Sequence, residues 1–326
     1  MKILFLVTED WYFFSHRLSM ARAARSDGAE VYVMSRITKL RAALEQEGFR
    51  VIDWHVSRGS WNPILELRSF SEVVGAYRHV RPDLLHHIAL KGILHGGVAA
   101  RICGGIPSIN AVAGLGYLFS SSTRKAALLR GAFSRVMKWV MGGGDSVALF
   151  QNEENRDTLT AANIVRKERS VIIRGVGVDI EKFSSKLEPG GVPIVLLPSR
   201  MLWDKGVAEF VSAARLLKQD GVTARFVLVG RLDLDNPAAI ADSQLRKWVN
   251  TGIVEWWGHR DDMAVVFAEA HLVCLPSYLE GLPKVLLEAA ACGRAIVTTD
   301  VPGCRDVVKH GSNGLLVPPK DANSLA

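Results

Sequence analysis

Short apolar runs alternate with helical patterns along the whole chain of 326 residues. The runs are rich in β-branched residues, and between them apolar residues return every three or four positions, as in amphipathic helices. The pattern predicts strands near 2–7, 31–35, 50–54, 84–88, 108–112, 146–150 and 170–174, and again near 194–200, 225–230, 253–256, 272–276, 295–300 and 314–318. Strands that alternate with helices form parallel sheets, so we expect a fold of the α/β class.

A polar stretch with proline and glycine, EKFSSKLEPGGVP at 181–193, separates the two series of strands. It predicts two domains, 1–184 and 185–326, each a doubly wound, Rossmann-like sheet with ligands outside the carboxyl ends of its strands. The last residues, DANSLA, begin with Asp321, a good helix N-cap, and stop soon afterwards. We therefore expect the second domain to be incomplete, truncated at the C-terminus.

The composition is that of a folded protein with a large core, because 48% of the residues are hydrophobic and 22% are charged. Four cysteines show no paired spacing, which is typical of reduced thiols in a cytoplasmic protein. The N-terminal apolar run soon reaches Glu9 and Asp10, so it predicts a strand, not a signal peptide. No uninterrupted apolar run is long enough to predict a membrane span.

Positive charge is concentrated in the first half of the chain. Residues 1–184 carry 25 Lys and Arg against 17 Asp and Glu, a balance of +8, whereas residues 185–326 carry 15 against 16, a balance of −1. Residues 84–144 contain no acidic residue at all. This distribution indicates an anionic partner such as a phosphate or a membrane surface. We expect no nucleic-acid partner, because no recognisable element that reads nucleic acid accompanies the charge.

Two polar loops follow strands of the second half. In SRMLWDKG, Arg200 and Lys205 are both able to bind an anion, the first as a planar fork and the second as a point charge. In VGRLDLDN, Asp233 and Asp235 form a D-x-D pair that suits either a divalent metal or a turn with a helix cap. The Asn-Pro that follows favours the turn. No zinc-ligand spacing, P-loop or dinucleotide fingerprint is present, and we expect no metal site.

The stretch SYLEGLPKVLLEAAACG at 277–293 places two glutamates eight positions apart. Pro283 suits the first position of a helix and Gly293 its end, so we expect a helix over 283–292 with Glu280 in the loop before it. The free N–H groups of the helix N-terminus form an anion seat between Glu280 and Glu288. This order matches the hydroxyls, diphosphate and ribose diol of a sugar nucleotide. Taken alone, however, the stretch favours the simpler interpretation that Glu280 interacts with the helix dipole and that Glu288 is a solvated surface carboxylate.

Residues 194–319 resemble the second domain of the retaining glycosyltransferases of family four, which have the GT-B fold. The segments that carry the resemblance are SRMLWDKG, EGLPKVLLEAAACGRAIVTTDVPGCRDVV and NGLLVP. The first half is similar to a subgroup through FFSHR, LKGILHGGVAARICGGIPSINAVAGLGYLF and VIIRGVGVD. Members of that subgroup build bacterial lipid-linked oligosaccharides and surface polysaccharides. The resemblance implies that 1–184 serves the acceptor, that 185–326 binds the nucleotide sugar, and that the two face a cleft.

The resemblance also implies roles for residues of the second domain. Arg200 and Lys205 would neutralise the donor diphosphate, and Glu280 would contact the hydroxyls of the donor sugar. Glu288 would bind the ribose diol. The backbone N–H groups of Gly281 and Leu282 would complete the phosphate seat.

In the first domain, the resemblance implies that Gly114 and Gly116 let the backbone approach the reaction centre. His16, at the start of the first long helix, would face the acceptor or donor phosphate.

The chain departs from many relatives in two places. Residues 10–14 replace a glycine-rich loop, and Ala113 stands where a histidine is common.

We therefore expect a retaining hexosyltransferase or N-acetylhexosaminyltransferase that uses a nucleoside diphosphate sugar, with a UDP-sugar favoured. The leaving phosphate would accept the proton of the acceptor hydroxyl on the same face of the sugar, with no metal or other cofactor. The acceptor would be lipid-diphosphate-linked or a polysaccharide. The alternatives are a nucleotide-sugar epimerase, a glycogen-synthase-like polymerase, and a protein that binds nucleotide sugars without turnover.

The segment 124–141, RKAALLRGAFSRVMKWVM, repeats apolar pairs every four residues and carries Lys125, Arg130, Arg135 and Lys138 without acids. The apolar stripe is typical of a helix that packs on a sheet. The cations favour an anionic membrane surface or a lipid diphosphate. We expect a peripheral enzyme on the cytoplasmic face of the cell membrane.

Overall fold

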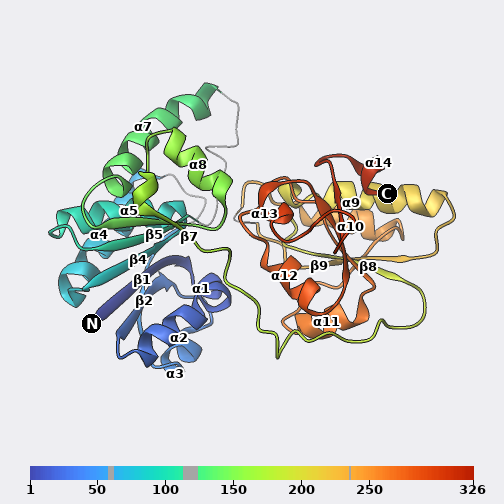
Figure 1. Ribbon diagram of the computed structural model, residues 1–326, viewed down its shortest axis with the longest axis horizontal. Coiled ribbons are helices and arrows are strands. Elements are labelled where there is room, and N and C mark those ends of the chain that lie inside the picture. Colours follow the sequence, from blue (N-terminus) through green and yellow to red (C-terminus); the bar gives the residue numbers. More distant parts are fainter. Residues whose placement is uncertain (58–61, 113–123, 235) are drawn as a thin grey trace. The chain divides into compact units, whose positions relative to one another are not determined.

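The computed structural model describes residues 1–57, 62–112, 124–234 and 236–326 (Figure 1). The chain divides into two compact units, Met1–Val176 and Gly177–Ala326. This division comes earlier than the expected boundary after residue 184. The physical reason is Phe183, which is buried in the core of the second unit and packs edge-on against Phe267, with ring centroids 6.2 Å apart.

The first unit is built on a sheet of seven parallel strands in the order β3-β2-β1-β4-β5-β6-β7. The strands are β1 (Lys2–Glu9), β2 (Glu30–Arg36), β3 (Arg50–Asp53), β4 (Leu84–Ile88), β5 (Ser108–Val112), β6 (Ser146–Phe150) and β7 (Ser170–Ile172). The order reverses between β1 and β4. In an open parallel sheet, ligands bind outside the carboxyl ends of the strands at such a switch point.

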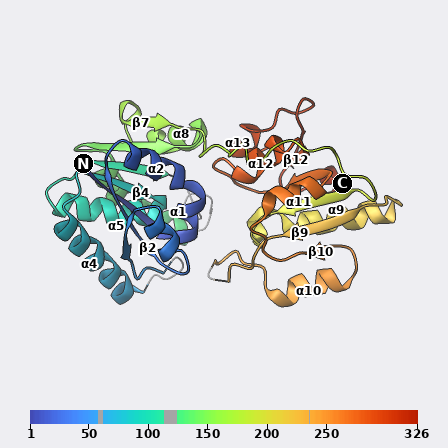
Figure 2. The same cartoon turned by 90° about the horizontal axis from the view of Figure 1, so that it is seen from below.

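Helices cover both faces of this sheet. They are α1 (Asp10–His16), α2 (Leu18–Ser26), α3 (Arg41–Gln46), α4 (Pro63–Val80), α5 (Ala89–Ile102), α7 (Arg124–Met141) and α8 (Glu153–Ala161), with a 3₁₀ turn η1 (Lys167–Arg169). Side chains of α1, α2 and α3 form one core cluster with Phe5 of β1. Side chains of α4 and α5 form another with Leu4, which alternates to the opposite face. Figure 2 shows the helices of this unit from a second direction.

The segment after β1 differs from our expectation. Residues 10–14 belong to the helix α1, and a second helix, α2, begins only at Leu18. The buried carboxylate of Asp10 explains this, because it accepts N–H bonds from Thr38 at 2.7 Å and Leu40 at 3.2 Å and holds the start of α1. His16 is therefore the last residue of a short helix, and the expected position at the start of the first long helix is wrong.

The second unit has a sheet of six parallel strands in the order β10-β9-β8-β11-β12-β13. The strands are β8 (Ile194–Pro198), β9 (Arg225–Val229), β10 (Glu255–Trp256), β11 (Leu272–Leu275), β12 (Ala295–Thr299) and β13 (Leu315–Val317). The helices are α9 (Val207–Gln219), α10 (Asp242–Asn250), α11 (Met263–Glu269), α12 (Lys284–Ala291), α13 (Pro302–Arg305) and α14 (Ala322–Leu325), with a 3₁₀ turn η2 (Trp203–Lys205). The order reverses between β8 and β11.

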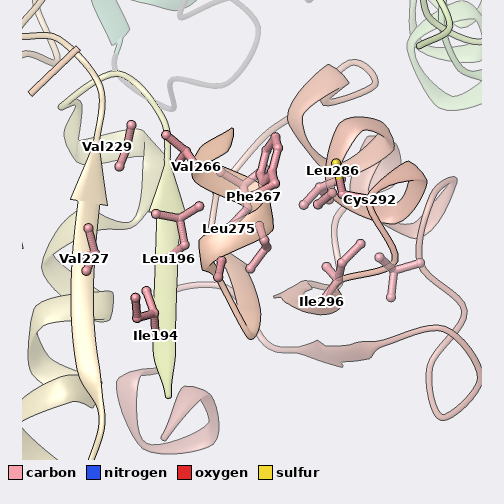
Figure 3. Close-up of a cluster of buried hydrophobic side chains, with 14 of the residues drawn as sticks. Ile194, Leu196, Val227, Val229, Val266, Phe267, Leu275, Leu286, Cys292 and Ile296 are labelled. Atoms are coloured by element: carbon pink, nitrogen blue, oxygen red, sulfur yellow. The ribbon is translucent and has the colours of Figure 1, made fainter. Parts of the chain in front are cut away.

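Two hydrophobic clusters fix the helices to this sheet. Figure 3 shows the cluster between the strands and helices α11 and α12, where Leu196, Val227 and Leu275 meet Phe267 and Leu286. The other cluster joins α9 and α10 to the opposite face. Because the strands are covered on both sides, they read as nearly continuous apolar runs, and this is why the sequence pattern locates them.

The local predictions for the second unit are largely confirmed. Helix α12 lies within the expected range, but Pro283 is its N-cap and not its first residue. Asp321 caps α14 and accepts the N–H groups of Asn323 and Ser324, each at 3.0 Å.

The four cysteines are free, and three of them are buried. Within the described residues, no helix is both long and apolar enough to cross a membrane.

Three glycines let the loops at the carboxyl edge of the second sheet touch through their backbones. A Cβ at Gly206 would overlap the carbonyl oxygen of Pro276. A Cβ at Gly230 would overlap the carbonyl oxygen of Ser199, and a Cβ at Gly303 would overlap the carbonyl oxygen of Gly281. The loops after β8, β9, β11 and β12 are thus packed against one another without intervening side chains.

Replacement of Gly206 by alanine is expected to destabilise the second unit severely. Gly206 has φ +70°, and its substituent would meet backbone that has no freedom to rotate away. Gly221→Ala is the matched control, because Gly221 has φ +81° and open space around it. The control should cost about 1 kcal/mol from the left-handed backbone alone, and Gly206→Ala should cost about 1–3 kcal/mol more. Equal urea-unfolding free energies for the two variants would contradict the packing argument.

The stability of the first unit is expected to fall at acid pH because His87 is buried in its neutral form. Its Nδ1 meets Asn110 Oδ1 at 2.8 Å and its Nε2 meets the Tyr77 hydroxyl at 2.9 Å. Burial lowers the pKa of His87 from 6.5 to about 4, so below pH 6.5 the unfolded chain binds a proton that the folded chain excludes.

Stability is therefore complete above pH 6.5 and is lost as the pH falls towards 4, with a cost of about 2 kcal/mol at about pH 5 from this one group. His87→Gln should flatten the dependence of the unfolding free energy on pH by that amount. His79→Gln, at an exposed histidine of the same unit, is the control. A slope unchanged by His87→Gln would refute the assignment.

Candidate active site

A group of charged side chains gathers where the strand order of the second sheet reverses. Arg200 follows β8, Asp233 follows β9, and Glu280 follows β11. In a parallel sheet these carboxyl ends share one edge, and the reversal between β8 and β11 opens a crevice there. Three loops that are far apart in sequence thereby supply side chains to one place.

Arg200 is held by Asp233. Its Nη1 donates to Asp233 Oδ2 at 2.6 Å, and the side chain of Asp233 is 9% exposed whereas that of Arg200 is 29% exposed. The carboxylate thus lies beneath the guanidinium. Because a guanidinium has five N–H donors, Arg200 retains donors for a further anion. The sequence pattern predicts Arg200 as an anion-binding residue, but for Asp233 it indicates only a turn or a metal pair.

The backbone around Arg200 explains why these two residues meet. Ser199 N donates to Val229 O at 2.9 Å, and Met201 N donates to Arg231 O at 3.0 Å, so the loop after β8 continues alongside the loop after β9. The carbonyl of Asp233 accepts from Asn236 N at 2.9 Å, which confirms the expected turn. Within the described part of the chain, no cluster of three or more metal-ligand side chains occurs, and Asp235 lies outside that part.

Lys205 and Glu280 form the second ion pair of the site. Lys205 Nζ lies 2.6 Å from Glu280 Oε1, and Ser277 Oγ donates to the same oxygen at 2.7 Å. Both charged side chains are less than one fifth exposed, so water screens the pair poorly. Both contacts are to Oε1, so with respect to the described residues Glu280 Oε2 is available for a ligand hydroxyl. Ser277, fully buried at the end of β11, was not among the predicted site residues.

Tyr278 links this loop to helix α9. Its hydroxyl donates to Glu209 Oε1 at 2.6 Å, its backbone N–H donates to Asp204 O at 2.9 Å, and the ammonium of Lys320 lies 4.9 Å from the centre of its ring. Burial, together with the neighbouring Glu209 carboxylate, raises the pKa of Tyr278 above its usual range. The phenol therefore stays protonated and serves as a fixed donor. No sequence pattern indicated this pairing.

Glu288 lies on α12, eight positions after Glu280. It is 9% exposed, and its Oε1 lies 3.2 Å from Lys284 Nζ. Burial raises the pKa of Glu288, and the charge of Lys284 partly offsets this. A solvated surface carboxylate is thus excluded. A poorly hydrated carboxylate on the first turns of a helix is suited to accept hydrogen bonds from a diol.

Gly281 and Leu282 connect the ion pair to α12, and both are half-buried. The carbonyl of Gly281 packs directly against Gly303 in α13, as described above. The chain then turns into the N-terminus of α12 at Pro283. Lys205, Glu280 and the first turn of α12 are consequently joined by a short, tightly packed segment.

The candidate residues of the first unit are placed less completely. Gly114 and Gly116 lie outside the described residues, and the side chains of Lys125 and Arg130 on α7 are likewise not described. His16 ends α1, where its ring stacks on Tyr12 with centroids 4.2 Å apart and its Nδ1 lies 2.6 Å from Ser15 Oγ.

Helix α7 packs part of its apolar stripe inward. Met137, Val140 and Met141 are buried against β6, as expected for a helix that covers a sheet. Trp139, however, is 52% exposed, and Lys138 beside it is also exposed. The described part of α7 therefore presents both an aromatic ring and positive charge at the surface.

Taken chemically, the site offers two cations that are already paired, a helix N-terminus and two poorly hydrated carboxylates. Such a set binds a molecule with an anionic centre and hydroxyl groups on both sides of it. Cys304 beside the site is no nucleophile, because burial raises the pKa of its thiol to about 12.

Comparison with known proteins agrees with this chemistry. Residues 2–141 match the family described as glycosyl transferase 4-like, and residues 192–326 match glycosyl transferases group 1. Over 340 residues the chain is 31% identical to the N,N'-diacetylbacillosaminyl-diphospho-undecaprenol alpha-1,3-N-acetylgalactosaminyltransferase of Campylobacter jejuni, with 100% of this chain and 88% of that enzyme covered.

Two further proteins are similar over most of the chain. The UDP-Gal:alpha-D-GlcNAc-diphosphoundecaprenol alpha-1,3-galactosyltransferase of Escherichia coli is 26% identical, with 80% of this chain and 69% of that enzyme covered. The crystal structure of Anabaena HepE in complex with UDP and glucose superposes with a TM-score of 0.78 at 21% identity, with 100% of this chain and 88% of that one covered.

The likeness to HepE establishes the fold, and the match to the Campylobacter enzyme over the whole chain establishes the family. The chain belongs to the glycosyltransferases of family four and has their GT-B fold of two Rossmann-like, parallel-sheet domains.

Proposed function

We propose that the protein transfers a sugar from a nucleoside diphosphate sugar, with a UDP-sugar favoured, to a lipid-diphosphate-linked acceptor, with retention of configuration. The observation that carries the proposal is the pairing of Lys205 with Glu280 and of Arg200 with Asp233 at the switch point of the second sheet. The similar Escherichia coli enzyme uses UDP-Gal, and both similar enzymes act on undecaprenyl-diphosphate-linked sugars, as their names state. The HepE crystals contain UDP and glucose.

In this proposal the donor diphosphate binds to Arg200, Lys205 and the N–H groups near Gly281 and Leu282. Glu280 receives hydroxyls of the donor sugar, since its second oxygen is not engaged by Lys205. Glu288 receives the ribose diol. The separation along α12 suits this order, because each helical residue advances about 1.5 Å.

The reaction breaks the bond between the anomeric carbon and the diphosphate oxygen and forms a bond to the acceptor oxygen on the same face. The diphosphate oxygen that leaves accepts the proton of the acceptor hydroxyl. Arg200 and Lys205 stabilise the negative charge that grows on the leaving group, and electrostatic stabilisation of this kind commonly contributes most to the rate enhancement of an enzyme. We propose no metal requirement, because these two cations supply the charge that a metal supplies in other enzymes.

The first unit is proposed to bind the acceptor, either a lipid-linked sugar diphosphate or a growing polysaccharide. Its excess of positive charge and the exposed Trp139 and Lys138 on α7 support association with an anionic membrane surface. We propose that the enzyme works on the cytoplasmic face of the membrane as a peripheral protein.

The donor site is tested by thermal unfolding with UDP, GDP or ADP. UDP at a hundred times its dissociation constant should stabilise the protein by about 2.7 kcal/mol. Lys205→Ala and Glu288→Ala should each remove most of this stabilisation, because each deletes one contact of the bound nucleotide. Arg246→Ala, which breaks the exposed Arg246–Asp242 ion pair, is the control and should retain it. Absence of a shift with every nucleotide would refute the proposed donor site.

Turnover is tested with labelled UDP-sugars and a prenyl-diphosphate-linked N-acetylhexosamine. Product should form only when the acceptor is present, should keep the anomeric configuration of the donor, and should form equally in the presence of a metal chelator. Lys205→Ala should lower kcat by a factor of about 10² or more, the size typical for loss of one group that stabilises transition-state charge.

Release of a new nucleotide sugar without acceptor would instead identify an epimerase. Nucleotide binding without any product would identify a binding protein.

Membrane association is tested by flotation with liposomes that contain anionic lipid. Exchange of Lys125, Arg130 and Lys138 for glutamate should abolish binding, since each basic residue near such a surface contributes about 1 kcal/mol. The control exchanges Arg166, Lys167 and Arg174, which are exposed elsewhere on the same unit. Full binding after the first set of changes would overturn the proposed role of α7.

A further inference from the structure

Arg17, between α1 and α2, is a buried cation without an anionic partner among the described residues. The residue is 3% exposed, and with the described residues its guanidinium makes one long hydrogen bond, from Nη1 to the carbonyl of neighbouring His16 at 3.4 Å. Within the described part of the chain, its Nε has no hydrogen-bond partner and no carboxylate pairs with it. Burial lowers the pKa of Arg17, although an arginine remains charged in a protein.

A second buried arginine shows what a structural role looks like in this chain. Arg294 is 4% exposed, and it donates to the carbonyl oxygens of Cys292 at 3.0 Å, Ala270 at 3.2 Å, Lys186 and Leu187. Its charge is thus surrounded by acceptors that hold the linker to the second unit. Arg17 has no comparable set among the residues that the structure describes, so packing alone does not account for a charge in that position.

His86, on β4, is the companion of Arg17. It is 3% exposed, its ring stacks on Phe5 with centroids 5.1 Å apart, and its Nε2 has no partner in the described ranges. Adjacent His87 is fully hydrogen-bonded on the opposite face of the sheet. Burial and the nearby charge of Arg17 lower the pKa of His86 to about 3. Two unsatisfied polar groups therefore lie close together under one face of the sheet.

Their place in the fold favours a ligand. Arg17 follows α1, the helix that begins directly after β1, and His86 is in the middle of β4, where it lies beside Phe5 of β1. The order of the first sheet reverses between these two strands. Tyr12 and His16, stacked on each other and half-exposed, belong to the helix that leads to Arg17. Open parallel sheets bind ligands outside the carboxyl ends of the strands that flank such a reversal. The second unit binds its proposed donor at the corresponding switch point.

We infer that Arg17, supported by His86, is an anion-binding site of the first unit that takes a phosphate of the lipid-diphosphate acceptor. The inference rests on the proposed function. The ligand is anionic because Arg17 offers only donors and a full charge. It belongs to the acceptor because the donor diphosphate already has Arg200 and Lys205 in the second unit. The arginine is a binding residue, and His86 positions it or donates to the same phosphate.

The first test compares the stability of Arg17→Met and Arg294→Met. Methionine fills the volume of the arginine stem without its charge. Arg17→Met should unfold at the same temperature as the natural protein or a higher one, because it removes an unpaired buried charge. Arg294→Met should unfold at a lower temperature, because it leaves several carbonyl groups without donors. An equal loss of stability in both variants would mean that Arg17 is structural and would overturn the inference.

The second test measures binding of farnesyl diphosphate by calorimetry with UDP present at saturation, so that the donor site is occupied. Arg17→Met should weaken farnesyl diphosphate binding by a factor of about ten or more, the effect of losing one charge-assisted contact to a phosphate. Arg17→Lys should weaken it less, because lysine keeps the charge. The stabilisation by UDP alone should be unchanged in both variants.

The results separate this inference from the proposed function. UDP binding in the natural protein with farnesyl diphosphate affinity unchanged by Arg17→Met would refute the site and leave the donor proposal standing. Loss of the UDP response in Arg17→Met would assign the arginine to the donor and equally refute the acceptor role. Failure of UDP to stabilise even the natural protein would contradict the proposed function itself.

Discussion

Parallel strands bring their carboxyl ends to one edge of a sheet, and that constraint arranges the charged groups of the candidate site. The strand order reverses once in each unit, between β1 and β4 and between β8 and β11. Neighbouring connections leave in opposite directions at a reversal, so the loops there do not cover one another. Arg200, Asp233 and Glu280 meet at the second reversal although they are separated by many residues along the chain.

The electrostatics of the candidate site follow from burial. Lys205 and Glu280 are each poorly exposed and neutralise one another, which avoids an isolated charge in a region that water hardly reaches. In the proposed function, an incoming diphosphate would compete with carboxylates that are already in place, and its two phosphates would give it the charge to do so. The same reasoning distinguishes Arg17. Among the described residues no carboxylate pairs with its guanidinium, so an incoming phosphate would not have to displace one.

The sequence predicts the architecture well because the strands are covered on both faces. Each strand reads as an apolar run, and β4, β5 and β6 have the bounds that the pattern indicates. Glu280 and Glu288 were identified from the helix signals of Pro283 and Gly293, which are local. The pairing of Asp233 with Arg200, and that of Glu209 with Tyr278, depends on which loops become neighbours, and no local signal reports this.

The helix at residues 10–16 was missed for a related reason. Its start is held by the buried carboxylate of Asp10, whose partners Thr38 and Leu40 belong to the loop after the second strand. In isolation, an acidic residue after a strand suggests the beginning of a loop. The burial of Arg17 was equally invisible, since an arginine between two helical stretches ordinarily lies at the surface.

The glycines at 206, 230 and 303 have a consequence for motion. Because each allows one loop backbone to rest on another, the segments that carry Arg200, Lys205 and Glu280 form a single block. A ligand is unable to draw one of these residues forward by bending its loop alone, since the neighbouring backbone would have to follow. If the site binds a sugar nucleotide as proposed, adjustment to different sugars must come from rotation of side chains on a fixed backbone, and donor preference is changed more readily through those side chains than through the loop lengths.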